Sequence, residues 1–251
     1  MTKNRGALAY FFPGSTLALC VLLLCDAVNA QHHCSAEVKL LVSPQQIQQA
    51  LATFRVGKPS YGQIYLYDSE NLDLLSQGLI LRLRTGVKGD LTVKVRSSEV
   101  ENCKCSVYRV KAGKCEVDFV GSQVFTSYSI SEAWKRAEDV DSGQQLHSVL
   151  GTEQVQVLLA SGISVDWRQI TPRAKIQATT WDAHPDGPLK KVTIELWEWP
   201  GGRILELSAK AKSQNGADAM KILRQMAEGH ALNVEKNQVT KTAFVLRNAS
   251  L

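Results

Sequence analysis

Four cationic side chains with a two-residue spacing mark residues 78–96 as a candidate site for binding an anion. Arg82 and Arg84 alternate with leucines, and Lys94 and Arg96 alternate with valines. Glycines in the polar loop between the two runs favour a β-hairpin. Successive side chains of a strand face opposite sides, so all four cations would share one face. Such a face is either a solvated outer surface or a basic surface that binds phosphate, which arginine grips through two oxygens.

Charged side chains also recur at every second position, and therefore on one face (one parity of residue number), in other predicted strands. The acids are Glu37, Glu116, Asp118, Glu195 and Glu206, and the further cations are Lys39, Arg173 and Lys175. A solvated sheet face would mix serine, threonine, glutamine and lysine freely, whereas here cations and acids recur in pairs. The alternative is a closed barrel with a charged lumen and helices outside. Carboxylates in that lumen would hold a hard divalent cation, which bridges to phosphate oxygens.

Apolar periodicity and turn residues give the elements that must position these side chains. Ser43 and Pro44 begin a helix, and Gly162 ends a longer one. Strands are predicted over 35–42, 61–67, 78–84, 91–96, 107–110, 114–119, 168–181, 191–199 and 204–212. Helices are predicted over 44–54, 72–75, 131–134, 144–161 and 216–228, whereas 239–246 is either strand or helix.

The start of the chain predicts export. Lys3 and Arg5 precede an apolar run over residues 17–25, and Ala30 ends an acceptable cleavage site, so residues 1–30 read as a signal peptide. An uncleaved anchor remains the alternative. Residues 31–251 are expected to form a single domain without a membrane span, in a secreted, periplasmic or secretory-pathway location. The net charge of +5 does not indicate a nucleic-acid partner.

Four cysteines lie beyond the predicted signal: Cys34, Cys103, Cys105 and Cys115. In an exported chain this number predicts two disulfides. One bridge is expected to close the polar segment between Cys103 or Cys105 and Cys115. The Cys-x-Cys spacing and the isolated Cys34 fit a zinc ribbon badly. Fingerprints of a P-loop, a Rossmann site, a zinc protease or a serine hydrolase are not found in the sequence.

The order of these segments resembles the CYTH superfamily, the triphosphate tunnel metalloenzymes. Ser35-Ala36-Glu37-Val38-Lys39 is similar to the family's Glu-x-Glu-x-Lys strand, and the most specific match runs from Gly78 through Arg84 to Thr92-Val93-Lys94. Further matches are Lys114 to Asp118, Arg173 to Lys175, Ile194 to Leu196, Leu205 to Leu207 and Lys241 to Ala243. The resemblance spans nearly all of residues 31–251.

What the resemblance implies is an α+β fold, an eight-stranded antiparallel closed barrel with helices packed on the outside. The implied substrate is small and phosphorylated, such as inorganic triphosphate or a nucleoside or thiamine triphosphate. Phosphate would be bound by Lys39, Arg82, Arg84, Lys94, Arg96, Arg173, Lys175 and Lys241. A single Mg²⁺ or Mn²⁺ would be bound by Glu37, Glu116, Glu195 and Glu206, with Glu37 and Lys39 taking part in catalysis.

Two departures from the family pattern leave three functions open. Ser35 replaces the first acid of the opening motif, and Ser208 replaces the acid expected after Glu206. The first function is metal-dependent hydrolysis of triphosphate-type anions. The second is non-catalytic binding of a phosphorylated ligand with a degenerate metal site. The third is a barrel for a hydrophobic ligand, with the charges on its outer surface.

Overall fold

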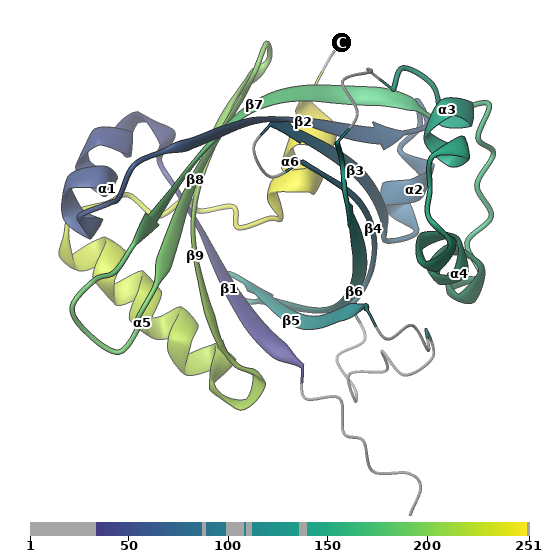
Figure 1. The fold of residues 1–251 in the computed structure, drawn as a ribbon. Coiled ribbons are helices and arrows are strands. Elements are labelled where there is room, and N and C mark those ends of the chain that lie inside the picture. The colour runs from purple at the N-terminus through teal and green to yellow at the C-terminus, as the bar shows by residue number, and fades with distance from the viewer. Residues whose placement is uncertain (1–33, 87–88, 99–107, 109–111, 136–139, 250–251) are drawn as a thin grey trace, which may run out of the picture. The chain divides into compact units, whose positions relative to one another are not determined.

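A closed β-barrel forms the body of the protein (Figure 1). The computed structural model describes residues 34–86, 89–98, 108, 112–135 and 140–249. In this part of the chain nine strands close in the order β1-β5-β6-β4-β3-β2-β7-β8-β9. They are β1 (Ser35–Val42), β2 (Ser60–Asp68), β3 (Leu79–Gly86), β4 (Asp90–Ser97), β5 (Lys114–Val120), β6 (Gln123–Ala133), β7 (Thr171–Ala183), β8 (Val192–Trp199) and β9 (Gly202–Lys212).

The predicted closed barrel is confirmed, but it is neither eight-stranded nor wholly antiparallel. β1 and β5 pair in parallel from Ser35 opposite Glu116 to Lys39 opposite Val120, and the other strand pairs are antiparallel. A parallel pair needs a long crossover, and the chain between β1 and β5 supplies it with three strands and two helices. The β1–β5 seam therefore closes the barrel between segments far apart in sequence.

β6 corrects the prediction of a helix over 131–134. Tyr128 and Ile130 are buried and alternate with small polar residues, of which Ser127 and Ser131 bond to inner-face side chains. This two-residue period is that of a strand, which continues to Ala133. The predicted strand over 107–110 and the predicted signal over 1–30 lie outside the described residues, apart from Tyr108.

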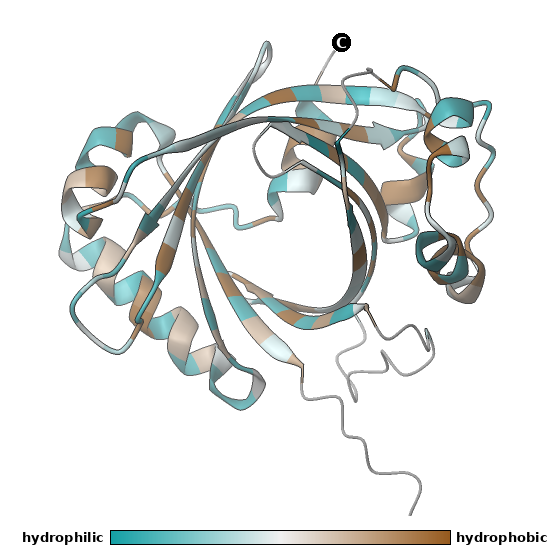
Figure 2. Cartoon of the chain, viewed as in Figure 1, coloured by the Kyte–Doolittle hydropathy of each residue, from teal (hydrophilic) through white to brown (hydrophobic). Residues whose placement is uncertain are grey.

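Helices cover the barrel on two sides, as the ribbon shows (Figure 1). One layer contacts β2, β3, β4 and β6 and consists of α2 (Asp73–Ser76) and α4 (Thr152–Ser161), with α3 (Gly143–Ser148) beside them. The other layer contacts β1, β5, β8 and β9 and consists of α1 (Ile47–Phe54), preceded by η1 (Pro44–Gln46), and α5 (Gly216–Gly229), preceded by η3 (Ser213–Asn215). Apolar and polar residues alternate along the strands beneath (Figure 2). Among the described helices, none has both the length and the apolarity that crossing a bilayer requires.

The segment that the sequence left as strand or helix is a helix, α6 (Lys241–Asn248), and it packs inside the barrel. Val245 and Leu246 are buried in a cluster with Ile64 and Leu66 of β2. Those two residues lie opposite Arg84 and Arg82 of β3, so they share the inner face with the arginines. The same cluster contains Leu41, Ala174, Ile176, Ala178, Trp197, Trp199 and Ile204. Part of the lumen is therefore apolar and filled by α6.

A side-chain amide anchors the segment that leads into α6. Gln238 Oε1 accepts a hydrogen bond from the Leu41 N–H at 2.9 Å, and Gln238 Nε2 donates one to the Leu41 carbonyl at 2.9 Å. The register of β1 with β5 ends at Lys39, so the backbone of Leu41 is beyond the reach of β5. Gln238 thus completes the β1–β5 seam and fixes the start of α6, which we call the plug because it fills part of the lumen.

Gln238→Ala is expected to lower the free energy of unfolding by about 1–3 kcal/mol, because it removes both hydrogen bonds to a buried backbone segment. Urea denaturation measures this change, and hydrogen exchange should show faster exchange in α6. Gln225→Ala, at an exposed position of α5, is the matched control and should leave both measurements unchanged. Equal stability of the two variants would contradict the anchoring role.

Candidate functional site in the barrel lumen

The alternating charges identified in the sequence face the lumen on four strands, β1, β3, β4 and β5. Inner-face side chains of β1, β4, β5 and β6 meet around Asp118, and those of β3 and β4 meet around Asp90. The intervening leucines and valines pack under the outer helices. The charges on these strands therefore do not form a solvated outer face.

Asp118 is the centre of the lumen network, and its side chain has no exposed surface. Its carboxylate lies 2.8 Å from Lys39 Nζ, 2.9 Å from Lys94 Nζ and 3.3 Å from an Arg96 nitrogen. The Ser127 hydroxyl donates a fourth contact at 3.1 Å. Burial alone would raise the pKa of Asp118, but the three cations hold it far below its ordinary value. Asp118 thus stays ionised and gathers cations from β1 and β4.

The lysines around Asp118 have opposite pKa shifts. Burial, followed by repulsion from Lys39, lowers the pKa of Lys94 to about 8, against the attraction of Asp118. Burial also opposes the charge on Lys39, but Asp118 and Glu37 raise the pKa of Lys39 above its ordinary value. Lys94 is therefore a cation with too little local negative charge, as expected of a group that an additional anion would stabilise.

A second group of cations lies between β3 and β4. Asp90 Oδ1 is 3.2 Å from Arg82 and Asp90 Oδ2 is 3.9 Å from Arg84. Burial, followed by repulsion from Arg84, lowers the pKa of Arg82 to about 10. The buried Nε atoms of Arg82 and Arg96 have no hydrogen-bond partner among the described residues. Two guanidinium N–H groups therefore lack an acceptor within the described part of the chain.

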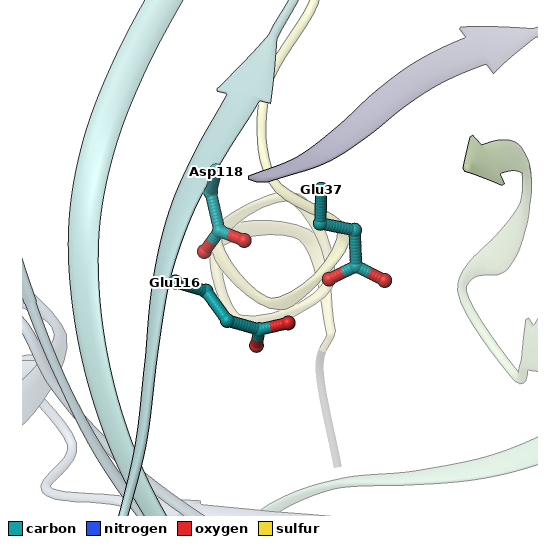
Figure 3. A group of neighbouring side chains, drawn as sticks. All are labelled: Glu37, Glu116 and Asp118. Atoms are coloured by element: carbon teal, nitrogen blue, oxygen red, sulfur yellow. The ribbon is translucent and has the colours of Figure 1, made fainter. Parts of the chain in front are cut away.

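Three carboxylates beside the Asp118 network could hold a metal ion (Figure 3). Glu37 comes from β1, and Glu116 and Asp118 come from β5, with one oxygen of each within 4.8 Å of the others. Burial opposes ionisation of Glu37, yet Lys39, 3.0 Å away, lowers its pKa below the ordinary value. Ionised oxygen donors are the ligands that Mg²⁺ and Mn²⁺ prefer, so this set fits such an ion.

The predicted metal ligands do not form one group. Glu37 and Glu116 join Asp118, whereas Glu195 and Glu206 face each other on β8 and β9 and both contact Lys241 of α6. The Lys241 ammonium also lies 4.7 Å from the centre of the Trp197 ring. Lys241, predicted to bind phosphate, therefore fastens the plug helix to the barrel wall in this structure. Ser35 and Ser208, which replace the expected acids, lie opposite Glu116 and Lys39 in the register.

Arg173 and Lys175 are not brought to this cluster. They flank Ala174, which packs in the inner apolar cluster, and the Lys175 ammonium lies 5.3 Å from the centre of the Tyr65 ring in the outer core. Arg173 stands beside a register shift opposite Leu66 and Tyr67. The parity argument fails on β7 because the inner face of this strand meets the apolar plug.

Of the four cysteines beyond the predicted signal, the structure describes Cys34 and Cys115. The Sγ atoms of Cys34 and Cys115 lie 2.7 Å apart at the start of the β1–β5 seam. We propose a Cys34–Cys115 disulfide in place of a bridge that closes the segment before Cys115. Cys103 and Cys105 lie outside the described residues.

Sequence reasoning missed Asp90, Thr92 and Ser127 as members of the site. Thr92 bonds to Asp90 at 2.7 Å and to Ser131 at 2.7 Å, so small polar residues orient the arginines. Their signal was the same alternation that marked the cations, since Asp90 and Thr92 share the parity of Lys94. Trp197 had no comparable signal, because its bond to Glu195 at 2.8 Å lies between inner-face residues of one strand.

Glu195→Gln should destabilise the protein at neutral pH. Burial would raise the pKa of Glu195, but Lys241 and Arg84 lower it from 4.5 to about 2. This difference corresponds to about 3 kcal/mol of stability, present above pH 4.5 and lost as the pH falls through the folded-state value.

The measurement is urea denaturation of wild type and variant at several pH values. The difference between them should be largest near pH 7 and shrink between pH 4.5 and 2. Glu198→Gln, at an exposed position of the same strand, is the control. A difference that stays constant with pH would contradict the ion pairing.

No family model matches the sequence, and no match is found among the curated proteins. Solved structures do match. One is HpAC1 from Hippeastrum, which is named as a candidate adenylyl cyclase and described as having a dominant triphosphatase activity. The alignment covers 86% of this chain and 96% of HpAC1, with a TM-score of 0.59 and 16% sequence identity. A candidate adenylate cyclase from Bacillus halodurans aligns with 84% of this chain and 97% of its own at a TM-score of 0.54 and 12% identity. The chain therefore shares the fold of these two proteins, in agreement with the closed barrel that its resemblance to the CYTH superfamily predicted.

Proposed function

We propose that the protein binds triphosphate-type anions in its lumen and hydrolyses them with Mg²⁺ or Mn²⁺. The observation that carries the proposal is the convergence of five cations, Lys39, Arg82, Arg84, Lys94 and Arg96, beside three carboxylates that could chelate a metal. The described activity of HpAC1 supports the same substrate class. Inorganic triphosphate, a nucleoside triphosphate and thiamine triphosphate all carry the phosphate chain that such a lumen would recognise.

An exchange of partners explains how a charge-balanced lumen could accept such an anion. Asp118 now neutralises Lys39, Lys94 and Arg96. A divalent cation on Glu37, Glu116 and Asp118 would take over the carboxylate and leave the three cations for phosphate oxygens. Removing a partner from a buried charge is costly, so metal and anion are expected to bind more tightly together than alone.

The residues of this chain would act mainly by holding and neutralising the phosphate chain. Arg82 and Arg96 each keep a free Nε–H for it, and Lys94 gains a counter-charge when it binds. Lys39, with a raised pKa, remains an ammonium that stabilises charge on the reacting phosphate. A bound Mg²⁺ or Mn²⁺ would supply neutralisation of the developing charge and activation of water.

Arg82→Ala with Lys94→Ala should abolish the thermal stabilisation that inorganic triphosphate gives to the wild type, because it removes one cation from the group around Asp90 and one from the group around Asp118. Differential scanning fluorimetry with and without Mg²⁺ measures the shift. Arg173→Ala with Lys175→Ala removes the same charges from a strand whose inner face is apolar, and this control should keep the shift. An unchanged shift in the lumen variant would count decisively against phosphate binding there.

The structure also offers support for the alternative of binding without catalysis. Ser35 and Ser208 add no carboxylate, and Glu195 and Glu206 are occupied by Lys241. The remaining metal ligands are shared with lumen lysines. A phosphate-ligand receptor would bind triphosphate and leave it intact.

Glu37→Gln separates the two functions. In an enzyme, wild type releases phosphate from inorganic triphosphate with Mg²⁺ or Mn²⁺, and the variant loses most of this activity while it still binds the anion. Phosphate release and calorimetric binding are measured on the same preparations. Binding by wild type without phosphate release would establish the receptor.

A barrel for a hydrophobic ligand is the least supported function. The inner apolar cluster is filled by side chains of α6, and the rest of the described lumen wall is charged. Export remains part of our proposal, and it would place the phosphorylated ligand outside the cytoplasm. A Cys34–Cys115 disulfide would be compatible with such a compartment.

A further inference from the structure

The two ends of the barrel differ in access and in charge. β1 and β5 begin, and β9 ends, at the same mouth, because β1 runs parallel to β5 and antiparallel to β9. The plug packs against the other ends of these strands. It shares an apolar cluster with Leu41 near the end of β1, Trp199 at the end of β8 and Ile204 near the start of β9. Among the described residues, α6 therefore fills the lumen at one end, and no described helix packs into the mouth formed by the start of β1.

Three lysines gather at this mouth: Lys114 on β5, and Lys210 and Lys212 on β9, here called the mouth lysines. Lys210 lies opposite Glu37, and Lys212 lies opposite Ser35, which itself lies opposite Glu116. They share the parity of Glu116 and Glu206, so they continue the inner wall outward. The Lys114 side chain is 47% exposed, and Lys210 and Lys212 are exposed.

The mouth lysines carry more positive charge than their surroundings neutralise. Lys114 contacts Glu116, and Glu37 lies near Lys210, but both acids belong to the carboxylate group that could hold a metal. Lys114 and Lys210 stand on the two strands that flank β1, β5 and β9, on either side of Glu37 and Ser35. A metal ion bound to Glu37 and Glu116 would offset the negative charge of these carboxylates and leave less of it to neutralise the mouth lysines.

We propose that Lys114, Lys210 and Lys212 form an outer anion subsite for a linear polyphosphate chain whose end occupies the lumen. The proposal rests on the proposed function of the lumen and extends it to ligands longer than triphosphate. A lumen filled by α6 at one end accepts the end of a chain, and the following phosphates then lie along the mouth lysines. Flexible lysines suit a chain with repeating charge and no fixed bidentate geometry.

The test compares inorganic triphosphate with a linear polyphosphate several times longer, using calorimetry on the intact protein with Mg²⁺. The wild type should bind the long chain more tightly. Lys210→Gln with Lys212→Gln should weaken binding of the long chain roughly tenfold, as expected for two exposed ion pairs, and leave triphosphate binding unchanged. The control, Arg203→Gln with Lys236→Gln, removes two exposed cations at the opposite end of the barrel, where β9 begins and the chain bonds to Leu41, and should weaken neither ligand. Lys114→Gln is a second, independent variant of the subsite.

The outcomes separate this inference from the proposed function. Equal weakening for both chain lengths, or none, would overturn the outer subsite and leave lumen binding intact. If the long chain binds in a lysine-dependent way and triphosphate does not bind at all, the lumen function is wrong and the mouth subsite stands. If an acidic polypeptide of similar charge binds with the same dependence on Lys210 and Lys212, the subsite does not select phosphate and the proposal fails. The advantage of the long chain should also shrink as salt rises, because the mouth lysines are exposed.

Discussion

The interaction on which the lumen depends is the contact of one buried carboxylate, Asp118, with three cations from two other strands. An isolated charge in such a place would be very costly, and each cation around it would be costly alone. The carboxylate partly compensates the three cations and fixes the relative positions of β1, β4 and β5. Asp118 is also one of the three carboxylates that could chelate a metal ion. The side chain that holds the lumen cations together is therefore also part of the candidate metal site.

The lumen is divided into a charged part and an apolar part, and the division follows from the position of α6. Where β2, β7 and β8 face the plug, their inner residues are apolar, as in the core of any globular protein. Where β1, β3, β4 and β5 face the remaining space, their inner residues are ionic. Lys241 joins the two parts, since it begins the apolar plug and reaches the carboxylates of Glu195 and Glu206.

Local patterns in the sequence predicted most strands and helices, because each of these depends on a short periodic segment. The first hairpin alone left its charged face either outside or inside, and only the recurrence of charge on other strands and the family resemblance favoured the lumen. The outward direction of the charged side chains of β7 could not be predicted in this way. Its charges alternate as regularly as those of β3, but the side that faces inward depends on pairing with β2 and on the plug. The grouping of Asp118 with Glu37, and the capture of Glu195 by Lys241, likewise depend on register between distant strands.

The pairing of β1 has a consequence for how the chain reaches its folded state. This first described strand lies between β5 and β9, so its backbone finds one neighbour at residues 116–120 and the other only at residues 205–212. Gln238, later still, completes its last hydrogen bonds. During synthesis β1 must therefore wait for β5, and its other edge stays unpaired until residues 205–212 have emerged. Contacts so distant in sequence slow folding, and a strand left waiting can pair with other chains, so a chaperone that holds this segment would favour correct closure.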